Sequence, residues 1–478
     1  MTGVRERIER LFKGPDAFDL TSGGIARPLF FLSLPIVITN LFQTAYNLAD
    51  TFWLGQYSTD ALAAISFAFP MVFLLISLGL GISVAGSVLV AQYTGAGADA
   101  EAEYAASQTV TFAVLASLLL GAVGYVFVDE FLAVMGASAD VLPMATGYME
   151  YISLGLFAMF GFAVFVSLMR GYGDTVTPML VMFGSVVLNI VIDPFLIFGW
   201  GPFPALGIEG AAIATVFSRA LAFAIGLAIM FRGTRGVRIR LRDMAPDFDY
   251  LRRLARIGVP ASVEGTGRAL SMNLLLLIVA FFPDTVVAGY GIGTRVFSVV
   301  FLPAIAVARG VETMTGQNIG AGEPERAARA AGLAAKTLFC VLTAVGVLAW
   351  VFAGPIVGVF TTDSAVVDAA ATFVRYVALT FGFMGVMRAY TGSFRGAGET
   401  LTAAALSVVM LGFVRFPIAW VASGWVGETG IWIAFAVSNV LGALVAYAWY
   451  RRGGWRGGDL TRERVDVEED ALDGASTD

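Results

Sequence analysis

Long apolar stretches dominate this chain of 478 residues and restrict what it can fold into. A helix of about 20 mostly apolar residues crosses a bilayer, and it satisfies all its backbone hydrogen bonds internally. The alternation of apolar and polar residues that marks a barrel strand is absent. The sequence therefore predicts an all-α integral membrane protein with twelve transmembrane helices. These lie near 28–49, 61–88, 104–128, 142–168, 176–198, 209–231, 258–281, 285–313, 333–356, 366–389, 400–422 and 427–449.

The composition excludes an ordinary soluble protein. Hydrophobic residues make up 58% of the chain and charged residues 14%, and the mean hydropathy is +0.80. Soluble domains have about 25% charged residues. Cys340 is the single cysteine and there is no histidine, so the common zinc-ligand sets are missing. No nucleophile–base set or phosphate loop is evident, and we expect neither an enzyme nor a cofactor. A proton carrier within the membrane would have to be a carboxylate or a tyrosine.

The loops between the predicted helices fall into two classes by charge. Arginine is frequent in one class and, with lysine, absent from the other. Because positive loops stay in the cytoplasm, this pattern predicts a multi-pass protein of the cell membrane with both ends cytoplasmic. No cleaved signal peptide is apparent. Only two of the 30 basic residues are lysines, and the tail is acidic, which favours a halophilic prokaryote. The arginine-rich loops are 170–174, 231–256, 322–329 and 395–399.

The chain contains an internal repeat. The segment AQYTGAGADAEAEYAA (91–106) resembles GQNIGAGEPERAARAA (316–331), and RGYGDT (170–175) resembles RGAGET (395–400). The offset along the chain is the same for both pairs. An even number of helices in each half predicts two pseudo-symmetric six-helix bundles related by an axis along the membrane normal. The predicted parts are a cytoplasmic N-terminal segment 1–27, an N-lobe 28–231, a cytoplasmic linker 232–257, a C-lobe 258–450 and a cytoplasmic acidic tail 451–478.

Asp193 is a carboxylate in the middle of the apolar stretch 176–198. An isolated charge in a spanning helix costs at least about 2.5–3.5 kcal/mol, so such a residue indicates a functional site. Ser185 and Asn189 lie on the same helix face as Asp193, at intervals of four. Pro194 removes a backbone donor, and we expect a bend there.

The first predicted helix carries a matching polar stripe. Asn40, Gln43, Asn47 and Asp50 fall within an arc of about 80° on an ideal helix. A polar stripe faces protein or water rather than lipid, so we expect Asp50 and Asp193 to meet in one bundle. Burial and mutual repulsion would favour a proton on such a pair, and the same oxygens could bind Na⁺. The sequence does not distinguish between H⁺ and Na⁺ as the cation that the pair binds.

Other side chains of the first half are candidates for the same site. Thr215 and Tyr148 could add hydroxyl groups, and Met182 belongs to a group of methionines that suits a cavity for varied apolar shapes. The second half is different, since segment 410–420, at the place of the Asn189/Asp193 pair, has no acid. Glu264 is a candidate cavity residue there, or it is simply neutralised by Arg268 one turn away.

The chain resembles the MATE (multidrug and toxic compound extrusion) transporters over residues 25–450. The motifs that carry the resemblance are NLADTFWLG (47–55), VAQYTGAG (90–97), RGYGDTVTPM (170–179) and LNIVIDPFLIFG (188–199). It is most similar to the DinF-like prokaryotic branch. That resemblance implies coupling to H⁺ or Na⁺ at three residues, Asp50, Asn189 and Asp193, and roles for Thr215 and Tyr148.

The NorM-like branch uses an acidic pair in the C-lobe. Here the helix near 366–389 carries Arg375 in its interior, and its single acid, Asp368, lies in its first turn, although Glu264 lies on the helix near 258–281. The C-lobe mechanism of that branch is therefore not matched by this chain.

The resemblance and the buried acids together predict a secondary active multidrug efflux antiporter. It would exchange H⁺ or Na⁺ for amphipathic, often cationic, compounds by alternating access. We expect a monomer in the lipid bilayer, with small-molecule substrates, no nucleic-acid partner and no resident metal. The arginines of the second half favour an alternative, a flippase for lipid-linked saccharides on a similar fold.

Overall fold

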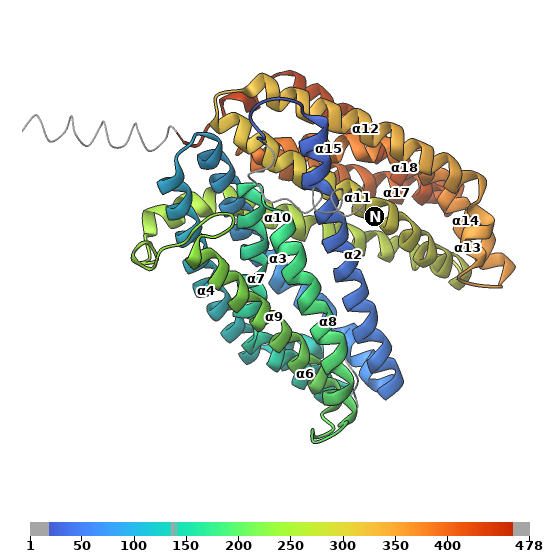
Figure 1. The fold of residues 1–478 in the computed structure, drawn as a ribbon. Coiled ribbons are helices and arrows are strands. Elements are labelled where there is room, and N and C mark those ends of the chain that lie inside the picture. The colour runs from blue at the N-terminus through green and yellow to red at the C-terminus, as the bar shows by residue number, and fades with distance from the viewer. Residues whose placement is uncertain (1–18, 135–137, 139–140, 462–478) are drawn as a thin grey trace, which may run out of the picture. The chain divides into compact units, whose positions relative to one another are not determined.

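The computed structural model describes residues 19–134, 138 and 141–461. It divides into two compact units (Figure 1). The N-terminal unit contains Leu34–Ser262, and the C-terminal unit contains Leu20–Ser33 and the chain from Val263 onward. The predicted N-terminal segment and acidic tail lie mostly outside the described residues.

The described residues of both units form helices joined by loops, and no strand occurs among them. Within the described part of the chain, nine helices are long and apolar enough to span a membrane. Two further spans are bent pairs. The helix α10, which carries Glu264 and Arg268, is not among these eleven, but with 32 residues it is long enough to be the twelfth. The prediction of twelve helices in two six-helix bundles is thus confirmed.

The spans of the N-terminal unit follow one another through short loops. The bent pair is α6 with α7, and the short helix α5 (Val128–Val134) occupies part of a predicted loop. The spans are α2 (Ala26–Tyr57), α3 (Thr59–Gly95), α4 (Asp99–Val126), α6 (Leu142–Leu154) with α7 (Leu156–Tyr172), α8 (Val176–Phe198) and α9 (Gly207–Arg232).

The C-terminal unit repeats this order. Its first span belongs to α10, which begins in the N-terminal unit, well before the start that the sequence predicts, and continues in the C-terminal unit from Val263. The predicted helix 333–356 is divided between α12 and the short α13 (Ala353–Gly358). The spans are α10 (Phe248–Val279), α11 (Asp284–Gly320), α12 (Pro324–Val351), α14 (Ser364–Ala378) with α15 (Phe381–Gly396), α16 (Thr400–Val408) with the π-helix η3 (Val409–Val414) and α17 (Arg415–Val426), and α18 (Thr429–Arg451).

The repeat extends to atomic contacts. A Cβ on Gly121 would lie 2.5 Å from the Ser153 carbonyl oxygen, and a Cβ on Gly346 would lie 2.1 Å from that of Ala378. The second pair occupies the positions that the sequence repeat assigns to the first. These glycines allow the third and fourth spans of each unit to approach backbone to backbone. The same close crossing therefore exists in both units.

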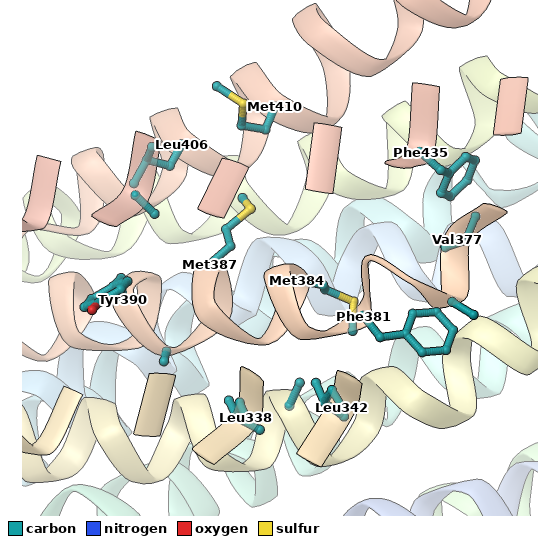
Figure 2. Packing of buried hydrophobic residues seen from close by; sticks show 14 of the residues in the cluster. Leu338, Leu342, Val377, Phe381, Met384, Met387, Tyr390, Leu406, Met410 and Phe435 are labelled. Atoms are coloured by element: carbon teal, nitrogen blue, oxygen red, sulfur yellow. The ribbon is translucent and has the colours of Figure 1, made fainter. Parts of the chain in front are cut away.

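The two bent spans are also equivalent. α6 and α7 meet at Gly155 with a bend of 53°, and α14 and α15 meet at residues 379–380 with the same bend. The latter break lies between Val377 and Phe381 (Figure 2). By contrast, α8 continues through Pro194 without a break.

Each unit has its own apolar core. In the C-terminal unit, α15 contributes Met384 and Met387 between α12 on one side and the segment of Met410 on the other (Figure 2). In the N-terminal unit, Tyr148, Met149 and Ile152 of α6 are among the buried residues of the core. Because most buried positions are apolar, the buried ionisable groups stand out as exceptions.

Candidate functional site

Two buried carboxylates define the candidate site in the N-terminal unit. Asp50 of α2 is 6% exposed and Asp193 of α8 is fully buried. Their carboxyl groups lie within hydrogen-bonding reach of each other. Ionised carboxylates only accept hydrogen bonds, so contact between them is favourable when one holds a proton. The helices thus bring together the two acids that the sequence predicts as partners.

Asn189 links this pair to the preceding turn of α8. Its Nδ2 donates a hydrogen bond of 3.1 Å to Asp193 Oδ1. Three buried oxygens accept no hydrogen bond from the described residues: Asp50 Oδ1, Asn189 Oδ1 and Asp193 Oδ2. Buried acceptors are normally satisfied, so this group of oxygens is suited to a proton or a small cation.

Hydroxyl groups from three helices surround the carboxylates. Tyr46, one turn before Asp50 on α2, donates to Thr215 Oγ1 of α9 across 2.6 Å. Tyr148 of α6 is 7% exposed and is close enough to interact electrostatically with both Asp50 and Asp193. The site is therefore built from α2, α6, α8 and α9.

One buried cation lies beside the acids. Arg219 of α9 is 6% exposed and donates to Gln43 Oε1 across 2.8 Å and to Met182 Sδ across 2.9 Å. Its guanidinium carbon lies 4.9 Å from the centre of the Tyr46 ring. With one proton shared between Asp50 and Asp193, the two acids and Arg219 are neutral together. With both acids ionised, the group carries one negative charge.

The other predicted residues have different surroundings. Ser185 donates to the Ser218 carbonyl across 3.1 Å, so it ties α8 to α9. Asn47 is exposed and accepts a hydrogen bond from Gln43. Asn40 is half-buried on α2. The polar stripe of the first helix therefore contributes Asp50 and, through Arg219, Gln43 to the buried group.

Glu264 belongs to a separate cluster in the C-terminal unit. Both of its carboxylate oxygens accept from Arg395 Nη1 at 3.1 Å, and Oε1 also accepts from Ser407 across 3.0 Å. Arg395 in turn donates to Glu312 across 3.0 Å. Arg268, the neighbour one turn away, forms no ion pair within 4.0 Å among the described residues. The partner of Glu264 thus lies on another helix, far along the chain, and spacing along one helix could not indicate it.

Two residues of the candidate site were missed by the sequence reasoning, Tyr46 and Arg219. Tyr46 lies one turn from Asp50 on its face of α2, so helical spacing could have identified it. Arg219 is the only arginine of the span α9 before its last residue, Arg232. A basic residue inside an apolar helix is as informative as an acidic one.

Comparison with known proteins agrees with this architecture. The MatE family model matches residues 35–195 and 260–421, once in each half. The chain is 29% identical over 438 residues to a FAD transporter of Shewanella oneidensis, covering 90% of this chain and 96% of the relative. It is 28% identical over 453 residues to the probable multidrug resistance protein NorM of Thermotoga maritima, covering 92% and 96% of the two chains.

Solved structures show the same fold. A multidrug resistance MATE family transporter in an outward-facing conformation matches with a TM-score of 0.83 and 25% identity, over 93% of this chain and 97% of the other. A Vibrio cholerae MATE transporter matches with a TM-score of 0.85 and 22% identity, over 90% of this chain and 98% of the other. The matches of the family model, the repeated six-helix units and the motifs of the first half lead to one conclusion: the chain belongs to the MatE family of membrane transporters and is not an enzyme.

Proposed function

We propose that this protein is a secondary active exporter that exchanges H⁺ or Na⁺ for amphipathic, often cationic, compounds by alternating access. The observation that carries the proposal is the buried contact between Asp50 and Asp193. Relatives named as multidrug resistance or multidrug export proteins, such as the 24% identical MepA of Staphylococcus aureus, support the substrate class.

Charge balance gives the coupling its physical basis. The ionised pair together with Arg219 carries one net negative charge in a poorly hydrated place, where charge is costly. Uptake of a single H⁺ or Na⁺ by the Asp50, Asn189 and Asp193 oxygens removes that cost. A cation that binds one conformation more tightly than the other shifts the equilibrium between them.

Competition for the same carboxylates would couple the two ligands. A cationic substrate that approaches the ionised pair neutralises it, and so does H⁺ or Na⁺. Binding of one would weaken binding of the other, by the same factor in both directions. Entry of the coupling ion down its gradient would then release the substrate on the outer side, with both ends of the chain in the cytoplasm.

The proposal is tested by counterflow of ethidium in proteoliposomes under an imposed pH or Na⁺ gradient. We expect one of the two gradients to drive efflux, and Asp193→Asn and Asp50→Asn to abolish the gradient-driven part. Asp60→Asn is the matched control, since Asp60 is an exposed acid at the start of α3. Efflux that persists at the wild-type rate in folded Asp193→Asn would exclude the coupling role of the pair.

The substrate range is tested in the same vesicles. Cationic and neutral dyes address the proposed class directly. The name of the Shewanella relative adds FAD, whose phosphates are negatively charged, as an anionic compound to be included.

A further inference from the structure

The C-terminal unit contains more buried positive charge than its acids balance. Glu264 and Glu312 are the only carboxylates within 4.0 Å of its clustered arginines, among the residues that the structure describes. Arg395 and Arg309 already take the close contacts with these two acids. Arginine remains charged in proteins, so the arginines that are left carry uncompensated charge.

Arg388 of α15 is the first of these. It is 5% exposed, and its nearest carboxylate oxygen, Glu264 Oε1, is 3.8 Å from Nη1, beyond hydrogen-bond distance. Its guanidinium carbon lies 4.6 Å from the centre of the Phe301 ring. A ring face stabilises a cation only partly. The side chain of Arg388 donates no hydrogen bond to an acceptor in the described part of the chain, and its fork of N–H groups remains available.

Arg415 is the second. It is 5% exposed and donates to Ser438 Oγ across 2.8 Å and to Asn439 Oδ1 across 3.0 Å. Both acceptors are neutral, so they orient the guanidinium without balancing its charge. Arg415 directly follows the π-helix η3. Single π-helical turns interrupt α-helices at functional sites more often than elsewhere.

The uncompensated arginines form one cluster. Glu264 Oε1 lies 3.8 Å from Arg388 Nη1 and accepts from Arg395 Nη1 across 3.1 Å, and Arg268 lies one turn from Glu264 on α10. The charges of Arg268, Arg395 and Arg415 all act on Arg388. Arg268, on α10, is only partly buried. The cluster thus extends from the buried Arg388 and Arg415 toward the surface of its own unit.

The repeat makes the contrast with the N-terminal unit specific. The fifth span of the N-terminal unit carries Asn189 and Asp193, whereas the fifth span of the C-terminal unit carries Arg415 and no acid. In the sixth spans the arginine is in the N-terminal unit instead. Arg219 on α9 corresponds in the repeat to the neutral Asn439 on α18. Equivalent helices therefore differ in charge between the two units.

We propose that Arg268, Arg388 and Arg415 form an anion-binding subsite that takes a phosphate or carboxylate group of a transported solute. Guanidinium groups bind such groups through paired N–H···O hydrogen bonds. A bound anion would supply the additional negative charge that the arginines need beyond the two charges of Glu264 and Glu312. This inference rests on the proposed transport function and adds to its cationic compounds a second substrate class, organic anions or zwitterions with an apolar part.

Two flavins that differ by one phosphate provide the test. Binding of flavin mononucleotide and riboflavin to the purified full-length protein in neutral detergent is measured by quenching of flavin fluorescence. We expect flavin mononucleotide to bind roughly tenfold more tightly, as one charged hydrogen-bonded contact provides. Arg388→Gln and Arg415→Gln should each reduce that preference to about twofold or less. Arg388→Lys, which keeps the charge but not the fork, should retain part of it.

Arg295→Gln is the matched control, because Arg295 is exposed on α11 of the same unit. It should keep the full preference. Equal binding of the two flavins to the wild type, absence of binding by both, or a preference unchanged in Arg388→Gln and Arg415→Gln would each overturn the proposal. Unfolding curves establish that the variants are folded.

A lipid headgroup is a second source of the same phosphate chemistry. Vesicles containing phosphatidylglycerol are therefore added to the flavin mononucleotide binding assay. If they displace the flavin, the lipid headgroup binds at the same site. Binding of the lipid with no binding of flavin mononucleotide would overturn the assignment to a transported solute. Ethidium counterflow in the same preparations separates the two proposals, since it depends on Asp50 and Asp193 and would persist if only the anion subsite were wrong.

Discussion

Tyr46 and Thr215 are joined by a hydrogen bond of 2.6 Å, although they lie on the first and last spans of the N-terminal unit. This bond connects α2 to α9 directly beside Asp50. It fixes the ring of Tyr46, over which the guanidinium of Arg219 lies. This contact thus holds the aromatic face on which the cation lies, one turn from the buried acid.

The first prediction concerns this bond. Tyr46→Phe and Thr215→Val should each lower the free energy of unfolding by about 0.6 kcal/mol, a typical value for hydrogen bonds between membrane helices. The double variant should lose little more than either single one, because both remove the same bond. Reversible unfolding in detergent–lipid mixtures measures the three values.

Tyr125→Phe provides the control for that cycle, since Tyr125 is 43% exposed. It should leave stability unchanged. Full additivity of Tyr46→Phe and Thr215→Val would show that the two side chains do not interact.

The second prediction concerns Glu264. Glu264→Gln removes the carboxylate that accepts from Arg395 and Ser407 and leaves buried arginines without it. The free energy of unfolding should fall by about 3–5 kcal/mol, which is the typical cost of removing one partner of a buried ion pair. Thermal and chemical unfolding measure it, with Glu130→Gln, at an exposed position, as the control.

A double variant sharpens that prediction. Glu264→Gln combined with Arg388→Gln removes one charge of each sign, so it should be more stable than Glu264→Gln alone. Equal or lower stability of the double variant would contradict a net positive charge in the cluster.

The third prediction concerns close helix crossings. Gly346→Ala would place a Cβ 2.1 Å from the Ala378 carbonyl oxygen, and Gly121→Ala would place one 2.5 Å from that of Ser153. Each substitution should lower the free energy of unfolding by about 1–3 kcal/mol, as overpacking generally does. Melting temperatures in one detergent give the comparison.

Gly332→Ala is the control on the same helix as Gly346, because a Cβ there meets no atom within 4 Å. It should be neutral or slightly stabilising, since alanine favours helix. A loss equal to that of Gly346→Ala would refute the packing explanation.

The fourth prediction concerns the start of the C-terminal unit. Arg326 donates hydrogen bonds to the carbonyl oxygens of Leu20, Ser22 and Gly23. Arg326→Met should release this segment, so that chymotrypsin cleaves after Leu20 several times faster. Timed proteolysis followed by mass spectrometry detects the cut. Arg329→Met, at an exposed position of the same helix, should leave the cleavage rate unchanged.

Much of the architecture was predictable because it depends on local patterns. Apolar length indicated the spans, and loop motifs repeated at one offset indicated the two units. The facing of Asp50 and Asp193 followed from polar stripes, since a stripe in a membrane helix needs a protein or water neighbour. Helical spacing sufficed for these residues.

Other features depend on contacts between distant helices. The partner of Glu264 is Arg395 rather than the nearer Arg268, because side chains of different helices meet there. The break at Gly155 is not marked by a proline, whereas Pro194 lies within an unbroken helix. Whether a proline breaks a helix depends on the neighbours that satisfy the freed carbonyl groups.

The matching 53° bends also separate what the two halves share from what distinguishes them. The bends and the glycine crossings occur in both halves, whereas Asp193 belongs to one half and Arg415 to the other. Each half thus uses the same helical framework to hold buried charge of a different sign. A substitution at a bend or a crossing therefore has an internal counterpart in the same molecule, whereas a substitution at Asp193 or Arg415 has none.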